Sequence, residues 1–192
     1  MAVAAGAQEP PGGPDGFRRD VGVLRRFLDL DRSFTADARA RAEASLSRLE
    51  ARAARLTPAG FQLAAAEIAA LAGNGHTMLV PAPWASRFDR IPLRLHGFAD
   101  GLFVVHAPEG LHETRGGRVV AIDGRPVAEV QRVHVGLCGA LEAKCRDWIG
   151  FFVEAPELMH AAGLAWRDDR LKLVLERPDG SLVTREVEAA AD

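Results

Sequence analysis

The chain has 192 residues, of which 48% are hydrophobic and 26% charged, and its net charge is -2. This composition supports a buried core, so we expect either one domain of ordinary size or two small ones. The balanced charge excludes the basic field that drives nucleic-acid binding, and no apolar run approaches the ~18 residues of a membrane span.

The first 16 residues are rich in glycine, proline and alanine, which is typical of a disordered tail, predicted here as residues 1–16. Ala5-Gly-Ala7 resembles the small-x-small site at which a signal peptide is cleaved, but no positively charged leader precedes it. We therefore expect a cytoplasmic protein as the sequence is written. A signal peptide encoded upstream of Met1 would instead make the protein periplasmic.

Three helices are predicted next, because apolar residues recur at helical spacing. They span residues 18–30, 36–56 and 57–72. The third has Thr57 as its N-cap and Pro58 at its first helical position, and Gly73-Asn-Gly75 ends it, since these residues accept the left-handed conformation. Together the helices form a predicted N-terminal helical segment, residues 17–75.

After residue 76 the hydrophobic pattern favours strands, separated by turn residues. The predicted strands are 92–96, 102–106 and 118–122, followed by a terminal hairpin of 171–176 and 182–187. A short helix is predicted over 126–133, and residues of about 136–164 form a helical insertion. The fold class is therefore α+β, with an antiparallel β module over residues 76–192 that carries this insertion.

The two cysteines, Cys138 and Cys145, lie seven residues apart in the predicted helical insertion. On one continuous helix this spacing separates their Cα atoms by about 10 Å, which is too far for a disulfide. We therefore predict a reduced, buried pair. Such a pair gives no argument for an oxidising compartment.

The sequence contains no local motif of a hydrolase, metal or phosphate site. None of the five serines lies in a G-x-S-x-G elbow, although a Ser-His-Asp set assembled in space stays open. His96 and His106 could face each other across a predicted hairpin, but no third ligand has metal-site spacing. We predict no catalytic residue, no metal and no cofactor.

Three residues are predicted to shape junctions of the chain. His76 and Thr77 follow the third helix, and we expect the His76 side chain to hydrogen-bond the backbone there. Gly124 follows the strand 118–122, which must reverse sharply, so we expect a positive φ at this glycine. Trp166, like the other tryptophans, is expected to anchor the core or an interface.

Four segments in a fixed order carry a family resemblance. They are Leu71-Ala-Gly-Asn-Gly-His-Thr-Met-Leu79, the stretch 92–105, the stretch 117–130 with Ile122-Asp-Gly-Arg-Pro-Val127, and the hairpin 171–187. Over residues 18–188 they resemble the N-terminal part of bacterial tail-specific (C-terminal processing) serine peptidases. The first segment is similar to that family's Asp-x-His-Thr junction, with Asn74 near where an acidic residue is common. The third is similar to the strand-turn-helix segment of PDZ domains.

The resemblance implies a PDZ-like β module that precedes a catalytic core with a serine nucleophile and a lysine base. We expect the chain to stop where that core would begin, and neither Lys144 nor Lys172 lies in a matching segment. PDZ-like modules capture peptides by adding a strand to a sheet edge. The peptide-binding residues that we expect are Phe98, Asp100, Gly101, Leu102 and Phe103.

The hypothesis that we favour is a non-catalytic peptide-recognition or scaffold portion of a peptidase-like protein. Its candidate partners are a peptide or an unfolded protein C-terminus, and a separate or downstream catalytic core. Two alternatives stay open: a truncated serine endopeptidase that needs a missing C-terminal core, and a structural or self-associating protein. A helix lying over the sheet edge would favour the last of these.

Overall fold

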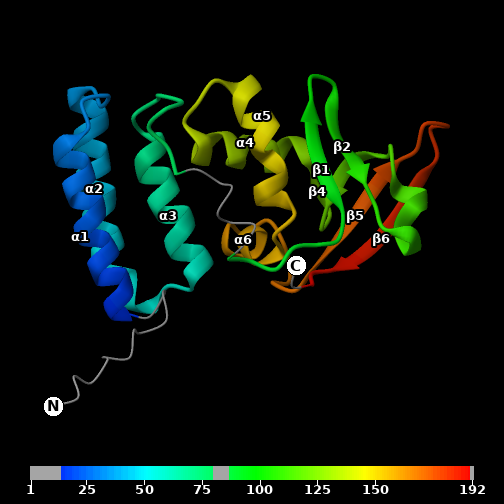
Figure 1. Ribbon diagram of the computed structural model, residues 1–192, viewed down its shortest axis with the longest axis horizontal. Helices are drawn as coiled ribbons and strands as arrows, with labels where there is room; N and C mark the ends of the chain where they lie inside the picture. Colours follow the sequence, from blue (N-terminus) through cyan, green and yellow to red (C-terminus); the bar gives the residue numbers. More distant parts are fainter. Residues whose placement is uncertain (1–13, 80–86, 191–192) are drawn as a thin grey trace, which may run out of the picture.

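The computed structural model describes residues 14–79 and 87–190, and its N-terminal part is helical (Figure 1). The elements are α1 (Pro14–Leu30), α2 (Ala36–Arg52), the 3-10 helix η1 (Ala53–Arg55) and α3 (Pro58–Ala70). All three predicted helices are present. Because α1 begins at Pro14, residues 14–16 of the predicted tail are helical, and residues 1–13 lie outside the described residues.

Side-chain caps define where these helices begin. Thr35 accepts a hydrogen bond from Ala38 N at the start of α2, and Thr57 accepts one from Gly60 N at the start of α3. The helices share a hydrophobic cluster in which Phe17 of α1 stacks on Phe61 of α3, with ring centroids 4.5 Å apart. The N-terminal helices therefore have a core of their own.

The strands form one antiparallel sheet in the order β1-β2-β3-β5-β6, with β4 paired to β3. They are β1 (Arg94–Phe98), β2 (Gly101–His106), β3 (Arg118–Ile122), β4 (Arg125–Pro126), β5 (Arg170–Glu176) and β6 (Leu182–Glu188), and the 3-10 helix η3 (Glu109–Thr114) connects β2 to β3. His96 pairs with Phe103 and His106 pairs with Arg94, so the two histidines do not face each other.

The region predicted as a helical insertion consists of separate helices that lie between the N-terminal helices and the sheet (Figure 1). They are α4 (Val127–Cys138), α5 (Glu142–Val153) and α6 (Pro156–Ala161). The short helix predicted over 126–133 is the first part of α4, which reaches into the range predicted as the insertion. Buried side chains of these helices, among them Ile149, Phe152 and Leu158, pack in one cluster with Leu171, Leu173 and Leu175 of β5.

The prediction of reduced cysteines was wrong, because Cys138 and Cys145 form a disulfide. The argument assumed one continuous helix, but α4 ends at Cys138 and Gly139 caps it in the left-handed conformation, with φ 64°. The chain then turns before α5 begins at Glu142, and this turn brings the two Cα atoms to 5.8 Å. That distance is ordinary for a disulfide.

The strand pattern at the C-terminus agrees with the prediction. In β5, Leu171, Leu173 and Leu175 are buried and Lys172 is exposed, which is the alternation of a strand with one face on the core. In the part of the chain that the structure describes, no helix is both long enough and apolar enough to span a membrane.

Candidate functional site

The residues predicted to bind a peptide lie at the tip of the β1–β2 hairpin. Phe98 ends β1, Asp100 lies in the turn, and Gly101 to Phe103 begin β2. Leu102 is fully buried and belongs to the core, so its side chain cannot contact a ligand. Phe98 is 45% exposed, and it packs edge-on against Phe103 with ring centroids 5.7 Å apart.

A surface cavity of about 440 Å³ lies beside this aromatic pair. Its lining residues are Phe98, Asp100, Phe103, Val104, Val105, Arg115 and Gly116. We call it the hairpin cavity. A smaller cavity of about 280 Å³ shares Asp100, Phe103 and Gly116 with it and continues towards Arg177 and Pro178. The two cavities therefore adjoin and extend from the hairpin tip to the β5–β6 turn.

The hairpin cavity combines apolar surface with a free cation. Phe98 and Val105 are exposed apolar residues, and both lie in the lining of the cavity. Arg115 forms no ion pair with any residue in 14–79 or 87–190, whereas the neighbouring Arg118 pairs with Glu176. The guanidinium of Arg115 is thus available to a carboxylate from another molecule.

The outer edge of β1 is covered by α5. A Cβ atom added to Gly97 would lie 2.5 Å from the Arg146 carbonyl oxygen, and one added to Gly150 would collide with the Leu95 carbonyl oxygen. Only glycine at these two positions lets the two backbones come so close. While α5 lies here, no further strand can pair with β1 along Leu95–Gly97.

Glu154, at the end of α5, completes this cover. Its buried carboxylate accepts a hydrogen bond from Leu95 N at 2.6 Å and pairs with Arg90 and, at 3.6 Å, with Arg94. Burial raises the pKa of Glu154 to about 7, although the Leu95 N–H and the Arg90 guanidinium oppose the rise. An edge amide of β1 is therefore satisfied from within the chain.

The junction after α3 is held by other side chains than expected. Thr77 is buried, and its hydroxyl hydrogen-bonds Asp31 at 3.1 Å and Ser33 at 2.8 Å. The Asn74 side chain donates a hydrogen bond from Nδ2 to Ser33 Oγ, and its Oδ1 accepts one from the backbone N–H of His76. Among the described residues, the exposed His76 ring has no hydrogen-bond partner, so its predicted role falls to Asn74 and Thr77.

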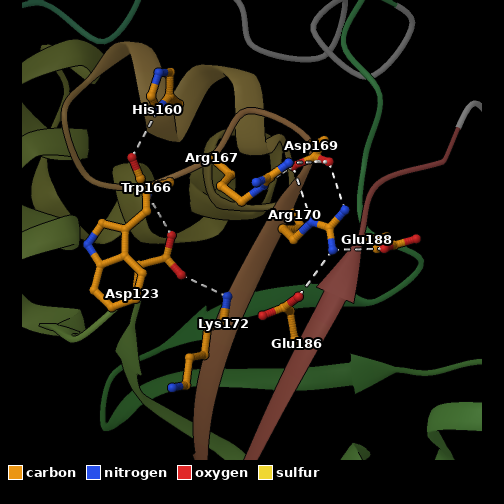
Figure 2. Close-up of polar contacts among 10 residues, drawn as sticks. Asp123, His160, Trp166, Arg167, Asp169, Arg170, Lys172, Glu186 and Glu188 are labelled. Atoms are coloured by element: carbon orange, nitrogen blue, oxygen red, sulfur yellow. Dashed lines mark hydrogen bonds and ion pairs between the residues drawn. The ribbon is translucent and has the colours of Figure 1, made fainter.

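Gly124 has the predicted positive φ, 78°, in the turn between β3 and β4. The sequence did not indicate the role of its neighbour Asp123, which is buried and also has a positive φ, 49°. Figure 2 shows that the Asp123 carboxylate accepts hydrogen bonds from the backbone of Trp166 at 2.9 Å and of Lys172 at 2.8 Å. Trp166, which is 67% exposed, is thus held on a fixed loop rather than in the core.

An exposed charge network lies beside this loop. Arg170 pairs with Asp169, Glu186 and Glu188, and Arg167 also pairs with Asp169 (Figure 2). These bonds hold the pKa of the Asp169 carboxyl well below its ordinary value. Exposed pairs of this kind contribute little to stability, and none of them faces the hairpin cavity lining.

The described residues offer no assembled catalytic or metal centre. They contain no group of three or more histidine, cysteine, aspartate or glutamate side chains that could hold a metal ion. Lys144 places its Nζ 5.1 Å from the Trp148 ring centre and 3.4 Å from the Gly75 carbonyl oxygen, and Lys172 is exposed. Within that part of the chain, neither lysine contacts a serine.

No family model and no curated protein sequence matches the chain. Among solved structures, mature CPAF is similar over 92% of this chain and 34% of its own, with 17% identity and a TM-score of 0.55. Mature CPAF complexed with lactacystin is similar over 92% of this chain and 35% of its own, with 16% identity and a TM-score of 0.52.

The photosystem II D1 C-terminal processing protease, at 14% identity, covers all of this chain and 45% of its own, but its TM-score of 0.33 is too low to bear on the fold. The chain thus spans about a third of the length of the CPAF structures that it matches. Identities this low establish a shared fold and no more. What these matches show is that the chain is similar in fold to part of mature CPAF.

Proposed function

We propose that this chain is a non-catalytic peptide-recognition module with a peptidase-like fold. The observation that carries the proposal is the hairpin cavity, because three of the residues expected to bind a peptide, Phe98, Asp100 and Phe103, line it. Concave, mostly apolar surfaces with a few polar groups are the usual form of a binding site. The ligand class is a peptide or an unfolded protein C-terminus.

The lining suggests how such a ligand would be held. An apolar side chain packs on Phe98 and Phe103, and a nearby carboxylate pairs with the free guanidinium of Arg115. Since α5 covers the edge of β1, binding to the chain in this form uses the outward face of the hairpin rather than an added strand.

Fluorescence anisotropy with labelled peptides tests the proposal. Peptides with an apolar residue beside a carboxylate should bind, and Phe103→Ala and Arg115→Gln should each weaken binding about tenfold or more, as loss of a central contact does. Leu182→Ala on β6 and Arg132→Gln on α4, both exposed and away from the cavity lining, serve as matched controls. No binding at millimolar peptide, or equal losses in the controls, would refute the assignment.

A second candidate function, a structural or self-associating protein, is favoured by one observation. The edge of β1 is covered by α5, as expected for a sheet that is not used to capture strands. Sedimentation equilibrium distinguishes the two candidates. A concentration-dependent dimer that binds none of the peptides would favour the structural role, and a peptide-binding monomer would exclude self-association.

A further inference from the structure

The disulfide and the covered sheet edge belong to the same helix, α5. We propose that the Cys138–Cys145 disulfide locks the first half of α5 over the edge of β1, and that its reduction by a dithiol uncovers this edge around Gly97. The inference rests on the proposed function in one respect, namely that the uncovered edge would then be a surface for an extended peptide.

The two halves of α5 are held in different ways. In the second half, Ile149, Phe152 and Val153 are buried in the main core, and Glu154 follows with its bond to Leu95. In the first half, residues 142–148, Cys145 is the one buried residue. This half also lacks a side-chain cap, since Leu141 at the N-cap position makes no capping bond.

The disulfide connects this weakly held half to a fixed point. Its other cysteine, Cys138, ends α4, and the following residue, Gly139, lies so close to α3 that an added Cβ would be 2.5 Å from Ala70 Cα. Among the described residues, two hydrogen bonds also link this half to other elements: one from His134 Nε2 to the Cys145 carbonyl oxygen at 2.9 Å, and a long one from Lys144 Nζ to the Gly75 carbonyl oxygen at 3.4 Å. Cleaving the disulfide therefore removes the covalent cross-link between residues 142–148 and the end of α4.

The part of β1 beneath this half presents backbone groups to it. Leu95 N donates to Glu154 and so points away from β2, and Gly97, two positions further along the strand, points the same way. The Arg146 backbone lies directly against Gly97. When residues 142–148 loosen, the N–H and C=O groups of Gly97 become available to another chain, which is the requirement for strand addition.

The reduction is an ordinary thiol–disulfide exchange. One thiolate of the dithiol attacks a sulfur of the Cys138–Cys145 bond and forms a mixed disulfide, and the second thiol of the reductant then displaces the remaining cysteine. The protein gains two electrons and two protons as two thiols, and the reductant becomes a disulfide. Because both cysteines are buried, the attack requires local opening, which the poorly capped start of α5 can supply.

Hydrogen exchange read by mass spectrometry tests the inference on the full chain, with and without dithiothreitol. After reduction, the amides of residues 140–148 and the amide of Gly97, read from overlapping peptides within 94–98, should exchange at least about tenfold faster. Peptides covering β3 and β5 should keep their protection. The double variant Cys138→Ala/Cys145→Ala should show the same fast exchange without reductant and no response to it.

Two outcomes would overturn the proposal. In the first, both cysteines are reduced, or replaced by alanine, and residues 94–98 remain as protected as before. In the second, exchange rises throughout the chain, which would make the disulfide a support of the whole fold. Peptide binding is measured separately: if exchange changes as expected but no peptide binds in either state, the lock stands and the proposed function fails.

Discussion

Gly150 offers the sharpest test of how α5 meets the sheet. In Gly150→Ala, the new methyl group would collide with the Leu95 carbonyl oxygen and lie 2.9 Å from Glu154 Oε1. The first of these atoms is backbone, so α5 and β1 must separate. Separation also stretches the hydrogen bond from Leu95 N to the Glu154 carboxylate.

Two opposing effects set the size of the change. Replacing glycine by alanine inside a helix stabilises it by about 1 kcal/mol when nothing is in the way. Overpacking costs about 1–3 kcal/mol, and a weakened bond to a buried carboxylate adds about 1 kcal/mol. We therefore expect the free energy of unfolding to fall by about 1–3 kcal/mol in Gly150→Ala.

Gly136→Ala is the matched control, because Gly136 lies inside α4 and an added Cβ there would meet nothing within 4 Å. This variant should gain about 0.5–1 kcal/mol. Urea denaturation followed by far-ultraviolet circular dichroism measures the unfolding free energy of both variants. If this free energy depends on urea concentration with the same slope as in the wild type, the unfolded states are comparable. If Gly150→Ala gained as much stability as Gly136→Ala, the close contact between α5 and β1 would be refuted.

Three further predictions concern the turn, the buried carboxyl and catalysis. Gly124→Val should lose about 1–3 kcal/mol of unfolding free energy, because φ is 78° at this position. Gly124→Asn should lose much less. A Gly124→Val variant that melts at the same temperature as the wild type would refute this prediction. Burial raises the folded-state pKa of Glu154 from 4.5 to about 7, so its contribution to stability is present below about pH 4.5 and lost as the pH rises through 7. Between pH 5 and 8, the unfolding free energy of the wild type should therefore fall by about 1–3 kcal/mol relative to that of Glu154→Gln. If the unfolding free energies of the two proteins changed in parallel with pH, this prediction would be contradicted. The purified chain should neither cleave unfolded casein nor react with a fluorophosphonate, because neither Lys144 nor Lys172 contacts a described serine; labelling that disappears when one serine is mutated would contradict it.

The features that the sequence predicted correctly depend on neighbouring residues. Thr57 and Pro58 define the start of α3 through a cap and a missing N–H, both of which act within one helical turn. The alternation around Lys172 and the turn at Pro178-Asp-Gly180 define the final hairpin in the same local way. Gly124 needs only the geometry of its own turn.

The features that could not be predicted from the sequence depend on residues far apart in the chain. Glu154 and Leu95 are 59 positions apart, and Asp123 and Lys172 are 49 apart, so no local pattern tells which buried carboxylate finds which backbone N–H. The disulfide did have a local indication, since a glycine directly after Cys138 is typical of a helix end. If the helix ends at this glycine, the two cysteines do not lie on one continuous helix, and the separation of about 10 Å between their Cα atoms no longer applies.

The two edges of the sheet are protected in different ways, and the difference bears on function. The far edge, β6, carries Arg185, Glu186 and Glu188, and charged side chains are a common means of preventing unwanted strand pairing. The near edge, β1, has glycine at 97 and depends on α5 for its cover. Covering an edge with a helix is itself a common protection, and Gly97 is what lets α5 come this close. The β1 edge differs from the β6 edge in that a disulfide holds one end of its cover, so the proposed reduction of this bond would expose β1 and leave β6 unchanged.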